Sequence, residues 1–338
     1  MAGGSRLRRN LMVYGKWFAM KLIRLCTLLL ALSIVSFCLI SLSPIDPVQA
    51  YIGADAMRVS PEQRQEIAAY WGLDDPPVMR YLHWASAILR GDMGTSMLYR
   101  TPVADVIGER FLHSAALMAV AWLASGVIGL ALGIVAAAHK GRWPDRLITW
   151  YCYTIASTPA FWIGLVLLVV FAVWLGWFPV GLAVPAGVLA AEVTLLDRIH
   201  HLILPALTLA MVSIAPIALH TREKLLAVLS SDHVLYARAR GEKGYALIMR
   251  HGLRNILLPA ITLQFTSFSE LFGGAVLTEQ VFSYPGLGQA TVAAGLGGDV
   301  PLLMGIVLCS ALFVFTGNLI ADALYKLVDP RMRKGGDG

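Results

Sequence analysis

Glu270 places a carboxylate inside a long apolar stretch of this chain, where charged groups are otherwise rare. It lies 11 residues after Pro259, roughly 16 Å along a helix, so we expect it near the middle of a membrane span. An ionisable side chain at that depth is energetically unfavourable and by default indicates a substrate or ion path. The alternative is a structural carboxyl that is hydrogen-bonded to Thr266, Ser267 or a neighbouring helix.

Thr266 and Gly273 lie four residues before and three residues after Glu270, so all three would share one face of a straight helix. We therefore treat them together as candidates for the substrate path. Their ordinary roles are simpler, because Thr266 can bond back to its own helix and Gly273 can let a neighbouring helix pack closely. A carboxylate in the path favours a cation or a metal chelate as cargo. We expect Glu279, farther along, to be a solvated carboxylate at the outer end of the same span.

Several kinds of chemistry lack the residues that they require. No G-x-x-x-x-G-K-[ST] phosphate loop occurs in the sequence, so nucleotide chemistry is not expected in this chain. The four cysteines lie in apolar runs without a C-x-x-C pair, and the adjacent His200 and His201 are poorly placed to bind one metal together. Paired carboxylates and Ser/His sets near one face are also missing. We predict a chain that is not an enzyme and that binds no metal or cofactor.

A basic, glycine-broken segment, YARARGEKGYALIMRHGLRNILLPAI, occupies residues 236–261 and leads into an apolar stretch. Just before it, Ser231 and Asp232 predict the N-cap of a short helix, and Gly241 is expected to end that helix. Gly244 permits a second change of direction. The segment is thus predicted to be a helix, a sharp corner and a second helix.

The charge of this segment has an ordinary explanation, since cytoplasmic loops hold anionic lipid headgroups through Lys and Arg. That explanation does not account for two short helices with glycines at the corner between them. A rigid, turned helix outside the bilayer has the shape needed to fit a groove on another protein and to transmit force to the spans.

The whole chain has the composition of a polytopic membrane protein. Of its 338 residues, 57% are hydrophobic and 14% are charged, against about 25% charged residues in soluble domains. Its formal charge of +6 follows the membrane topology, so we set nucleic-acid binding aside. Pro259 suits the first turn of the fifth span. Six apolar runs are long enough for spans of about 20 residues: 25–45, part of 111–139, 147–178, 202–220, about 256 onward, and 301–321.

The distribution of basic residues sets the orientation of these spans. With the N-terminus inside, 20 of the 27 Lys and Arg residues fall on the cytoplasmic side, in line with the positive-inside bias. We therefore predict an all-α polytopic membrane protein with six transmembrane helices and both termini in the cytoplasm. Its parts are a cytoplasmic N-terminus and entry to helix 1 (1–24), helix 1 (25–45), an outer loop (46–110), a transmembrane core (111–325) that includes the basic segment 222–255 between helices 4 and 5, and a cytoplasmic tail (326–338).

The outer loop, residues 46–110, is the one sizeable region predicted to lie in water outside the membrane. PEQRQEIAAYWGL and VMRYLHWASAIL within it indicate two short amphipathic helices. The loop is either a small cap over the mouth of the pore or a landing surface for an outside partner. Residues 48–50, VQA, are similar to a signal-peptide cleavage site. The apolar run before them is longer than the usual ~7–15 residues, so we favour an uncleaved first span.

ARARG followed by MRHGLRNILLPAI resembles the cytoplasmic coupling motif of ABC importer permeases, in the longer form of the dipeptide/oligopeptide/nickel branch. Further stretches are similar to that branch: GLDDPPVMRYLHWASAILRGDMGTS in the outer loop, STPAFWIGLVLLVVFAVWLGWFPV in the third span, LTEQVFSYPGLG after the fifth, and DPRMR near the C-terminus. Together these five matches occur in the expected order and are spread through most of residues 15–334.

The resemblance implies one of two related membrane subunits of an importer in the bacterial inner membrane, with a heterodimer expected. Two cytoplasmic ATPase subunits would bind ATP and Mg²⁺, and an extracytoplasmic solute-binding protein would deliver the cargo. Small alanines would allow close approach to an ATPase, and Gly241 would form the corner. The implied coupling residues are Tyr236, Ala237, Arg238, Ala239, Arg240 and Gly241. The implied outer-gate residues are Pro285, Gly286 and Gly288.

The cargo stays open on the sequence alone, because dipeptides, longer peptides, nickel and metal–opine chelates are all handled within this branch. A Glu before LFGG looks like the corresponding place in nickel importers of the branch. Whether the second permease is a different chain or a copy of this one also stays open. The alternative function is an autonomous secondary transporter or channel, although such proteins are expected to show matching repeats and the two halves here differ in loop length and motif.

Overall fold

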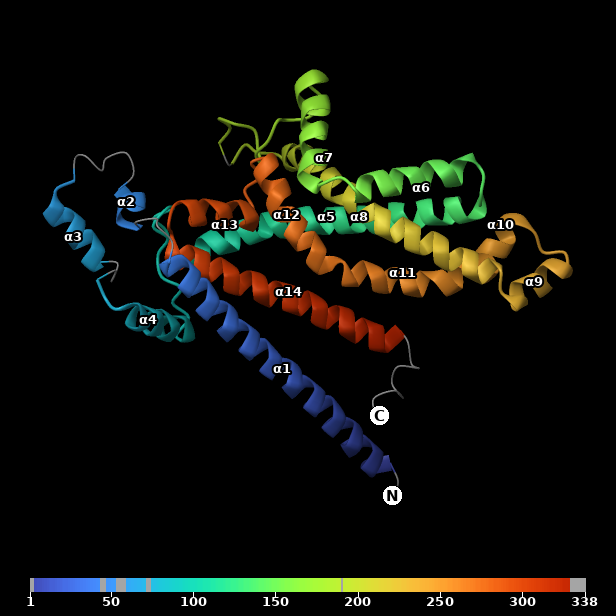
Figure 1. Ribbon diagram of the computed structural model, residues 1–338, viewed down its shortest axis with the longest axis horizontal. Coiled ribbons are helices and arrows are strands. Elements are labelled where there is room, and N and C mark those ends of the chain that lie inside the picture. The colour runs from blue at the N-terminus through green and yellow to red at the C-terminus, as the bar shows by residue number, and fades with distance from the viewer. Residues whose placement is uncertain (1–2, 43–46, 53–58, 71–73, 190, 329–338) are drawn as a thin grey trace. The chain divides into compact units, whose positions relative to one another are not determined.

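The computed structural model describes residues 3–42, 47–52, 59–70, 74–189 and 191–328. Within these residues the chain is helical, and one isolated antiparallel bridge between Thr95 and Pro102 is the only strand-like pairing (Figure 1). The prediction of an all-α protein is therefore confirmed. Two compact units divide the chain, Met1–Glu109 with Thr291–Phe315 and Arg110–Ala290 with Thr316–Gly338.

The first unit joins N-terminal helices to segments from the C-terminal third of the chain. The Tyr81 hydroxyl lies 2.8 Å from Ser33 Oγ, and its ring packs edge-on against Phe37. Buried Asp299 accepts a hydrogen bond from the Ser96 hydroxyl. The helices are α1 (Gly3–Ser41), α2 (Pro47–Ile52), α3 (Pro61–Tyr70), α4 (Pro77–Leu89), the start of α5 (Val103–Ala138), the end of α13 (Leu287–Leu296) and most of α14 (Val300–Val328).

Both short helices predicted in the outer loop form, as α3 and α4. Apolar residues gather on one side of α4, as predicted, but they are spread around α3. Three of the residues predicted to extend α3, 71–73, lie outside the described residues. The suggested cleavage motif at 48–50 falls within α2, so these residues are helical.

The second unit is organised around α8 (Leu195–Leu229), which packs against α6 (Trp143–Ala156), α7 (Ala160–Leu167), α11 (Arg254–Thr266) and α12 (Phe268–Val281). Figure 1 shows α8 running between α6 and α11. A capping box starts α8, because the Thr194 hydroxyl accepts from the Asp197 amide while the Asp197 carboxylate accepts from the Thr194 amide. This unit also holds most of α5, the start of α13 and the end of α14. Its shorter elements are η2 (Leu168–Trp174), α9 (Asp232–Ala239), α10 (Gly244–Leu247) and η3 (Ile248–Leu253).

Among the described residues, four helices are long and apolar enough to cross a membrane, namely Ala19–Ser41, Val103–Ala138, Leu195–Leu229 and Val300–Ala323. Two bent helix pairs raise the number to as many as six if each pair is one span. The first helix begins and ends earlier than the predicted 25–45, since α1 stops at Ser41 and residues 43–46 lie outside the described part of the chain.

The third predicted span is not one straight helix, which corrects the prediction of a single run over residues 147–178. Its two parts, Trp143–Ala156 and Ala160–Trp174, meet at an angle of 108°. Pro159 sits at the break and explains it, because a proline lacks an amide hydrogen and its predecessor avoids the helical conformation. The second part ends at Trp174, before the predicted end near Phe178.

The fifth predicted span also differs, because the helix is already formed at Arg254 and Pro259 lies inside it rather than in its first turn. The preceding η3 runs directly into α11, so Pro259 lies several residues after the first residue of α11. The chain instead bends by 48° between α11 and α12, at Ser267. This bend changes the geometry expected around Glu270.

Candidate functional site

The basic segment forms the predicted corner. Helix α9 ends at Ala239, and Gly241 follows with a φ of +94°, a conformation that side-chain-bearing residues rarely adopt. Gly244, with a φ of +64°, makes the second change of direction before α10. Ser231 occupies the backbone position of the N-cap, but its hydroxyl donates to the carbonyl of Val228 instead of capping α9. The predicted N-cap position at Ser231 is therefore confirmed, although its side chain does not cap the helix.

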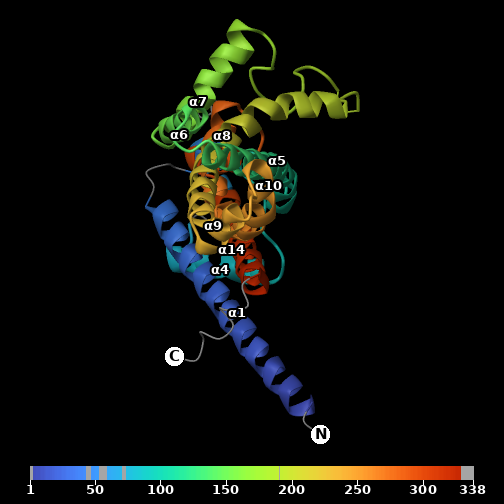
Figure 2. The same cartoon turned by 90° about the vertical axis from the view of Figure 1, so that its right-hand side faces the viewer.

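One face of α9 packs onto the second unit. Val234 and Ala237 are buried in an apolar cluster with residues of α8, α10 and η3 that include Leu225 and Ile248. Ala237 is only 5% exposed, so it anchors the helix and has no surface to offer another protein. Figure 2, which faces this end of the molecule, shows α9 and α10 next to each other.

The opposite face of the corner is exposed in the part of the chain that the structure describes. Tyr236 is 67% exposed, and the other exposed members of the predicted set are Arg238, Ala239, Arg240 and Gly241. We call these five residues the coupling corner. Contacts with η3 hold the turn after Gly241 in place. The Glu242 carboxylate lies 3.1 Å from His251 Nε2 and 3.5 Å from the Arg250 guanidinium. The corner thus presents two arginines and an aromatic ring on a braced turn.

Glu279 is fully buried, which corrects the expectation of a solvated carboxylate. Its oxygens accept hydrogen bonds from the Ser114 hydroxyl at 2.5 Å, the Gly288 amide at 2.7 Å and the Gln289 amide at 3.1 Å. The Ser114 oxygen in turn accepts from the Leu287 amide at 2.8 Å. We call Ser114, Glu279 and these three amides the outer-loop clamp.

The outer-loop clamp provides hydrogen-bond acceptors for the first amides of α13. The first amides of a helix have no partner inside the helix, and Leu287, Gly288 and Gln289 are the first three residues of α13. Ser114 and Glu279, which come from α5 and α12, accept from all three. A carboxylate near a helix N-terminus also interacts favourably with the helix dipole. Burial of Glu279 therefore follows from the fold of the loop after α12.

The glycines predicted at the outer gate are required by this packing. A side chain at Gly288 would place its first carbon 2.5 Å from the Cα of Val276, and one at Gly286 would collide with the Glu279 carboxylate. The turn before them is held by a bond from the Tyr284 amide to the Glu279 carbonyl. The stretch from Pro285 to Gly288 can thus close over Glu279 only with glycine at positions 286 and 288.

The predicted path residues lie at the bend between α11 and α12. Thr266 ends α11, whereas Glu270 lies in the first turn of α12 and Gly273 one turn later. The 48° bend separates Thr266 from the other two, so the expected shared face of one straight helix is wrong for Thr266 and holds for Glu270 with Gly273. The 16 Å distance along a straight span from Pro259 does not apply either.

All three side-chain positions are exposed on this chain. The Thr266 hydroxyl donates to the Thr262 carbonyl at 2.7 Å, which is its predicted ordinary role. A side-chain carbon added at Gly273 would meet nothing within 4 Å in the described structure, so no helix of this chain packs closely there. The start of α12 is fixed by the Ser269 hydroxyl, which donates to Asn318 at 2.7 Å.

The described residues contain no group of three or more His, Cys, Asp or Glu side chains able to hold a metal ion. His200 and His201 are engaged separately, with ring nitrogens 2.9 Å from the Trp177 carbonyl and 2.8 Å from the Asp197 carbonyl.

Comparison with known families decides the identity. The model of the binding-protein-dependent transport system inner membrane component matches residues 129–334, and the N-terminal model of the same membrane component matches residues 16–120. The chain belongs to this family of ABC importer permeases. The resemblance noted in the sequence is thereby confirmed.

Individual relatives cover nearly the whole permease. The oligopeptide transport system permease protein AppB of Bacillus subtilis (strain 168) is 38% identical over 306 residues, which is 90% of this chain and 95% of that protein. The glutathione transport system permease proteins GsiC of Salmonella typhimurium and of Escherichia coli (strain K12) are each 35% identical over 314 residues, or 93% of this chain and 97% of theirs. The permease is a multi-pass inner membrane protein.

The matched regions place the sites within the family. The model matched by residues 129–334 includes the coupling corner, Glu270 and Glu279. The DPRMR motif of the permease, at 329–333, falls in that range but outside the described residues. Sequence reasoning missed the role of Glu279 and Ser114. The only local signal was an acidic residue shortly before a Pro-Gly-Leu-Gly turn that opens a helix.

A second polar contact was also missed. The Asp145 carboxylate accepts two hydrogen bonds from the Arg222 guanidinium, at 2.5 and 2.9 Å, and a third from the Gly141 amide at 2.8 Å. This pair joins the first turn of α6 to the last third of α8, and α8 leads into the coupling corner. The residues are 77 positions apart, so no periodic pattern links them.

Proposed function

We propose that this permease is one of two membrane subunits of an ATP-driven importer, and that it moves peptides from a solute-binding protein into the cytoplasm by alternating access. The four candidate spans of the described residues, or up to six if each bent helix pair is one crossing, support this view. With six crossings both termini would lie inside. The orientation rests on the positive-inside bias. The observation that carries the proposal is family membership combined with an exposed, braced basic corner.

The coupling corner is suited to dock on a cytoplasmic ATPase. Its buried anchor, Ala237, fixes α9 to the apolar cluster that also contains Leu225 of α8 and Ile256 of α11. A push on the exposed face would therefore reach α8 and α11 through packed side chains. Rigid-body movement of the spans between inward-open and outward-open states would follow. ATP and Mg²⁺ would be held by the partner subunits.

Glu270 supports a path, and a partner, on the exposed side of the α11–α12 bend. A carboxylate that faces lipid tails is strongly unfavourable, so such groups line the interior of a bundle or a water-filled cavity. The described residues leave Glu270 and Gly273 exposed. A second, related permease subunit, expected to be a different chain, would cover that side and enclose a passage between the two. Thr266, on the other side of the bend, would contribute to its wall.

Peptides are the cargo class best supported. The relatives are named as oligopeptide and glutathione permeases, and a carboxylate in the passage complements the cationic amino terminus of a peptide. The loop from Pro285 to Gly288, held by the outer-loop clamp, would form part of the outer gate. The outer loop 46–110 would lie on the side where the solute-binding protein docks.

Reconstitution with the partner subunits tests this function. Arg240→Glu should leave insertion and subunit assembly intact but abolish cargo-stimulated ATP hydrolysis, since it reverses a charge on the coupling corner. Arg146→Glu changes an arginine of α6 that is also exposed but lies outside the corner, and it serves as the control. Transport by the purified permease without any ATPase would instead favour an autonomous transporter or channel.

A further inference from the structure

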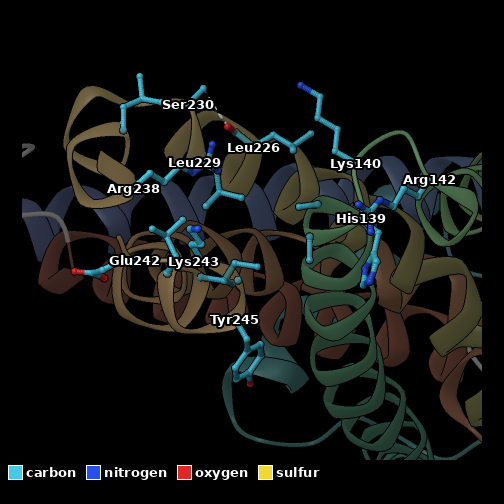
Figure 3. A pocket seen from close by; sticks show the side chains of 16 residues that line it. His139, Lys140, Arg142, Leu226, Leu229, Ser230, Arg238, Glu242, Lys243 and Tyr245 are labelled. Carbon is cyan, nitrogen blue, oxygen red and sulfur yellow. Dashed lines mark hydrogen bonds between the residues drawn. The ribbon is translucent and has the colours of Figure 1, made fainter. Parts of the chain in front are cut away.

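A cavity of about 990 Å³ lies between the α5–α6 turn and the α9–α10 corner, wholly within the second unit. Four Lys and Arg side chains line it, with Lys140 and Arg142 from the turn and Arg238 and Lys243 from the corner. His139 of the turn lines it as well. Figure 3 shows the two pairs on opposite sides of the cavity. The first pair comes from a part of the chain that the coupling role does not use.

The charge in the cavity is not neutralised by the chain. Within the described residues none of the four basic side chains forms an ion pair, and the one acidic group in the lining is Glu242. Glu242 is already engaged by Arg250 and His251. Figure 3 places it at the far side of the cavity from Lys140 and Arg142. The cavity therefore presents an excess of positive charge to any ligand.

The cavity also has an apolar wall. Leu226 and Leu229 from the end of α8, Leu235 from α9 and Leu247 from α10 line it together with Ala137. An inorganic anion would gain nothing from these side chains. A molecule with a phosphate at one end and a hydrocarbon part at the other would satisfy both kinds of lining.

The helices around the cavity indicate its position relative to the membrane. Residues 139–142 alone separate α5 from α6. Helix α5 is a candidate span and α6 is part of a bent candidate span, so we expect this turn at the membrane surface. Trp143, 75% exposed, begins α6 at the position expected for an interfacial aromatic residue. The Asp145–Arg222 pair holds the start of α6 against α8 beside the cavity.

We propose that this cavity binds the headgroup of an anionic phospholipid, with the phosphate between the two basic pairs and the start of an acyl chain against the leucines. Basic pockets between helices on the cytoplasmic side are typical sites for such headgroups. Because Arg238 belongs both to the cavity and to the coupling corner, a bound lipid would hold the corner in place and tune its response to the ATPase. The assignment to the inner leaflet rests on the orientation in the proposed function, whereas binding itself does not.

The test compares lipid binding by variants of the purified full-length chain with the subunits that co-purify. Lys140→Gln with Arg142→Gln removes two cavity charges, and Arg146→Gln removes a neighbouring exposed charge that does not line the cavity. We expect the wild type to retain phosphatidylglycerol over phosphatidylcholine in native mass spectrometry. The double variant should bind phosphatidylglycerol about 25-fold more weakly, since each basic residue near an anionic membrane contributes about fivefold.

Two further arms keep the test decisive. Lys140→Arg with Arg142→Lys preserves charge and should retain the lipid, which separates loss of charge from misfolding. Inorganic phosphate at millimolar concentration should not displace the lipid. Equal losses in the Arg146→Gln control, no preference for phosphatidylglycerol, or displacement by phosphate alone would each overturn the proposal. The Arg240→Glu assembly separates this proposal from the proposed function. If it binds the lipid normally but shows no cargo-stimulated ATP hydrolysis, lipid binding does not depend on coupling to the ATPase.

Discussion

The Ser114 hydroxyl donates a 2.5 Å hydrogen bond to the Glu279 carboxylate across 165 positions of the sequence, deep in the second unit. Together the two side chains accept from the first three amides of α13. A loop that would otherwise expose unpaired amides is thereby fastened to α5 and α12. The outer-loop clamp is therefore the structural basis for the position of the predicted outer gate.

Loss of either side chain of the clamp should release the start of α13. Ser114→Ala and Glu279→Gln each leave a buried group without its partner, which costs about 1–3 kcal/mol. We expect faster hydrogen exchange at the amides of residues 287–289 and a lower unfolding temperature. Glu192→Gln, in an exposed segment, provides the control. Unchanged protection of these amides in both clamp variants would contradict this interpretation.

Gly288 should tolerate no side chain. In Gly288→Ala the new carbon would approach the backbone of Val276 to 2.5 Å, and backbone cannot move aside as a flexible side chain can. We expect loss of transport with reduced yield of assembled complex. Gly295 lies in the same helix, and a carbon added there meets nothing within 4 Å. Gly295→Ala should therefore transport normally, and equal behaviour of the two variants would be evidence against the close packing.

Glu270→Gln should impair recognition of cargo without affecting insertion, because it removes a charge from the proposed passage. We expect a several-fold higher KM for a peptide with a free amino terminus, and little change for an N-acetylated peptide, in proteoliposome uptake assays. Glu223→Gln alters an exposed carboxylate on α8 and serves as the control. The same KM change for both peptides would argue for a structural role of Glu270.

Gly273 gives an independent test of the same passage. Gly273→Ala should be tolerated, because the structure leaves open space at that position. Gly273→Trp should block uptake while leaving the unfolding temperature of the isolated chain near that of the wild type, since no described side chain of this chain lies within 4 Å of the added carbon. Normal uptake by the tryptophan variant would place the passage elsewhere.

The Asp145–Arg222 pair should be sensitive to the loss of one partner. Asp145 is 3% exposed, whereas the Arg222 side chain is 27% exposed. Asp145→Asn would leave the guanidinium without its counter-charge at a cost of about 1–3 kcal/mol. The double variant with Arg222→Gln should be less destabilised than the sum of the single variants, as a double-mutant cycle in chemical unfolding would measure. Additive losses would mean that the two residues act independently.

Local signals in the sequence were sufficient for the long unbroken helices and for the coupling corner. Apolar runs of spanning length predict α5, α8 and α14 because a buried or lipid-facing helix must be apolar along its length. The corner at Gly241 followed from the conformational freedom of glycine, and its φ of +94° agrees. Motifs spread along the chain also indicated the family, since they are short and contiguous.

The bends show where local signals are insufficient. Pro159 coincides with a break of 108°, whereas Pro259 lies inside an unbroken helix and the second bend occurs at Ser267, where no proline stands. A proline removes one hydrogen bond wherever it occurs. Whether the helix then breaks depends on what the surrounding helices pack against it, and that is a property of the assembled unit.

The sequence by itself determined the fold class, the membrane location, the family and the basic corner, because each is encoded by neighbouring residues or by composition. Only the tertiary structure decided that Glu279 is buried with Ser114, that Ala237 faces inward, that Asp145 meets Arg222, and that two distant turns enclose one basic cavity. These relationships join residues far apart in the chain. Their energies come from burial and from geometry between elements, which no local pattern records.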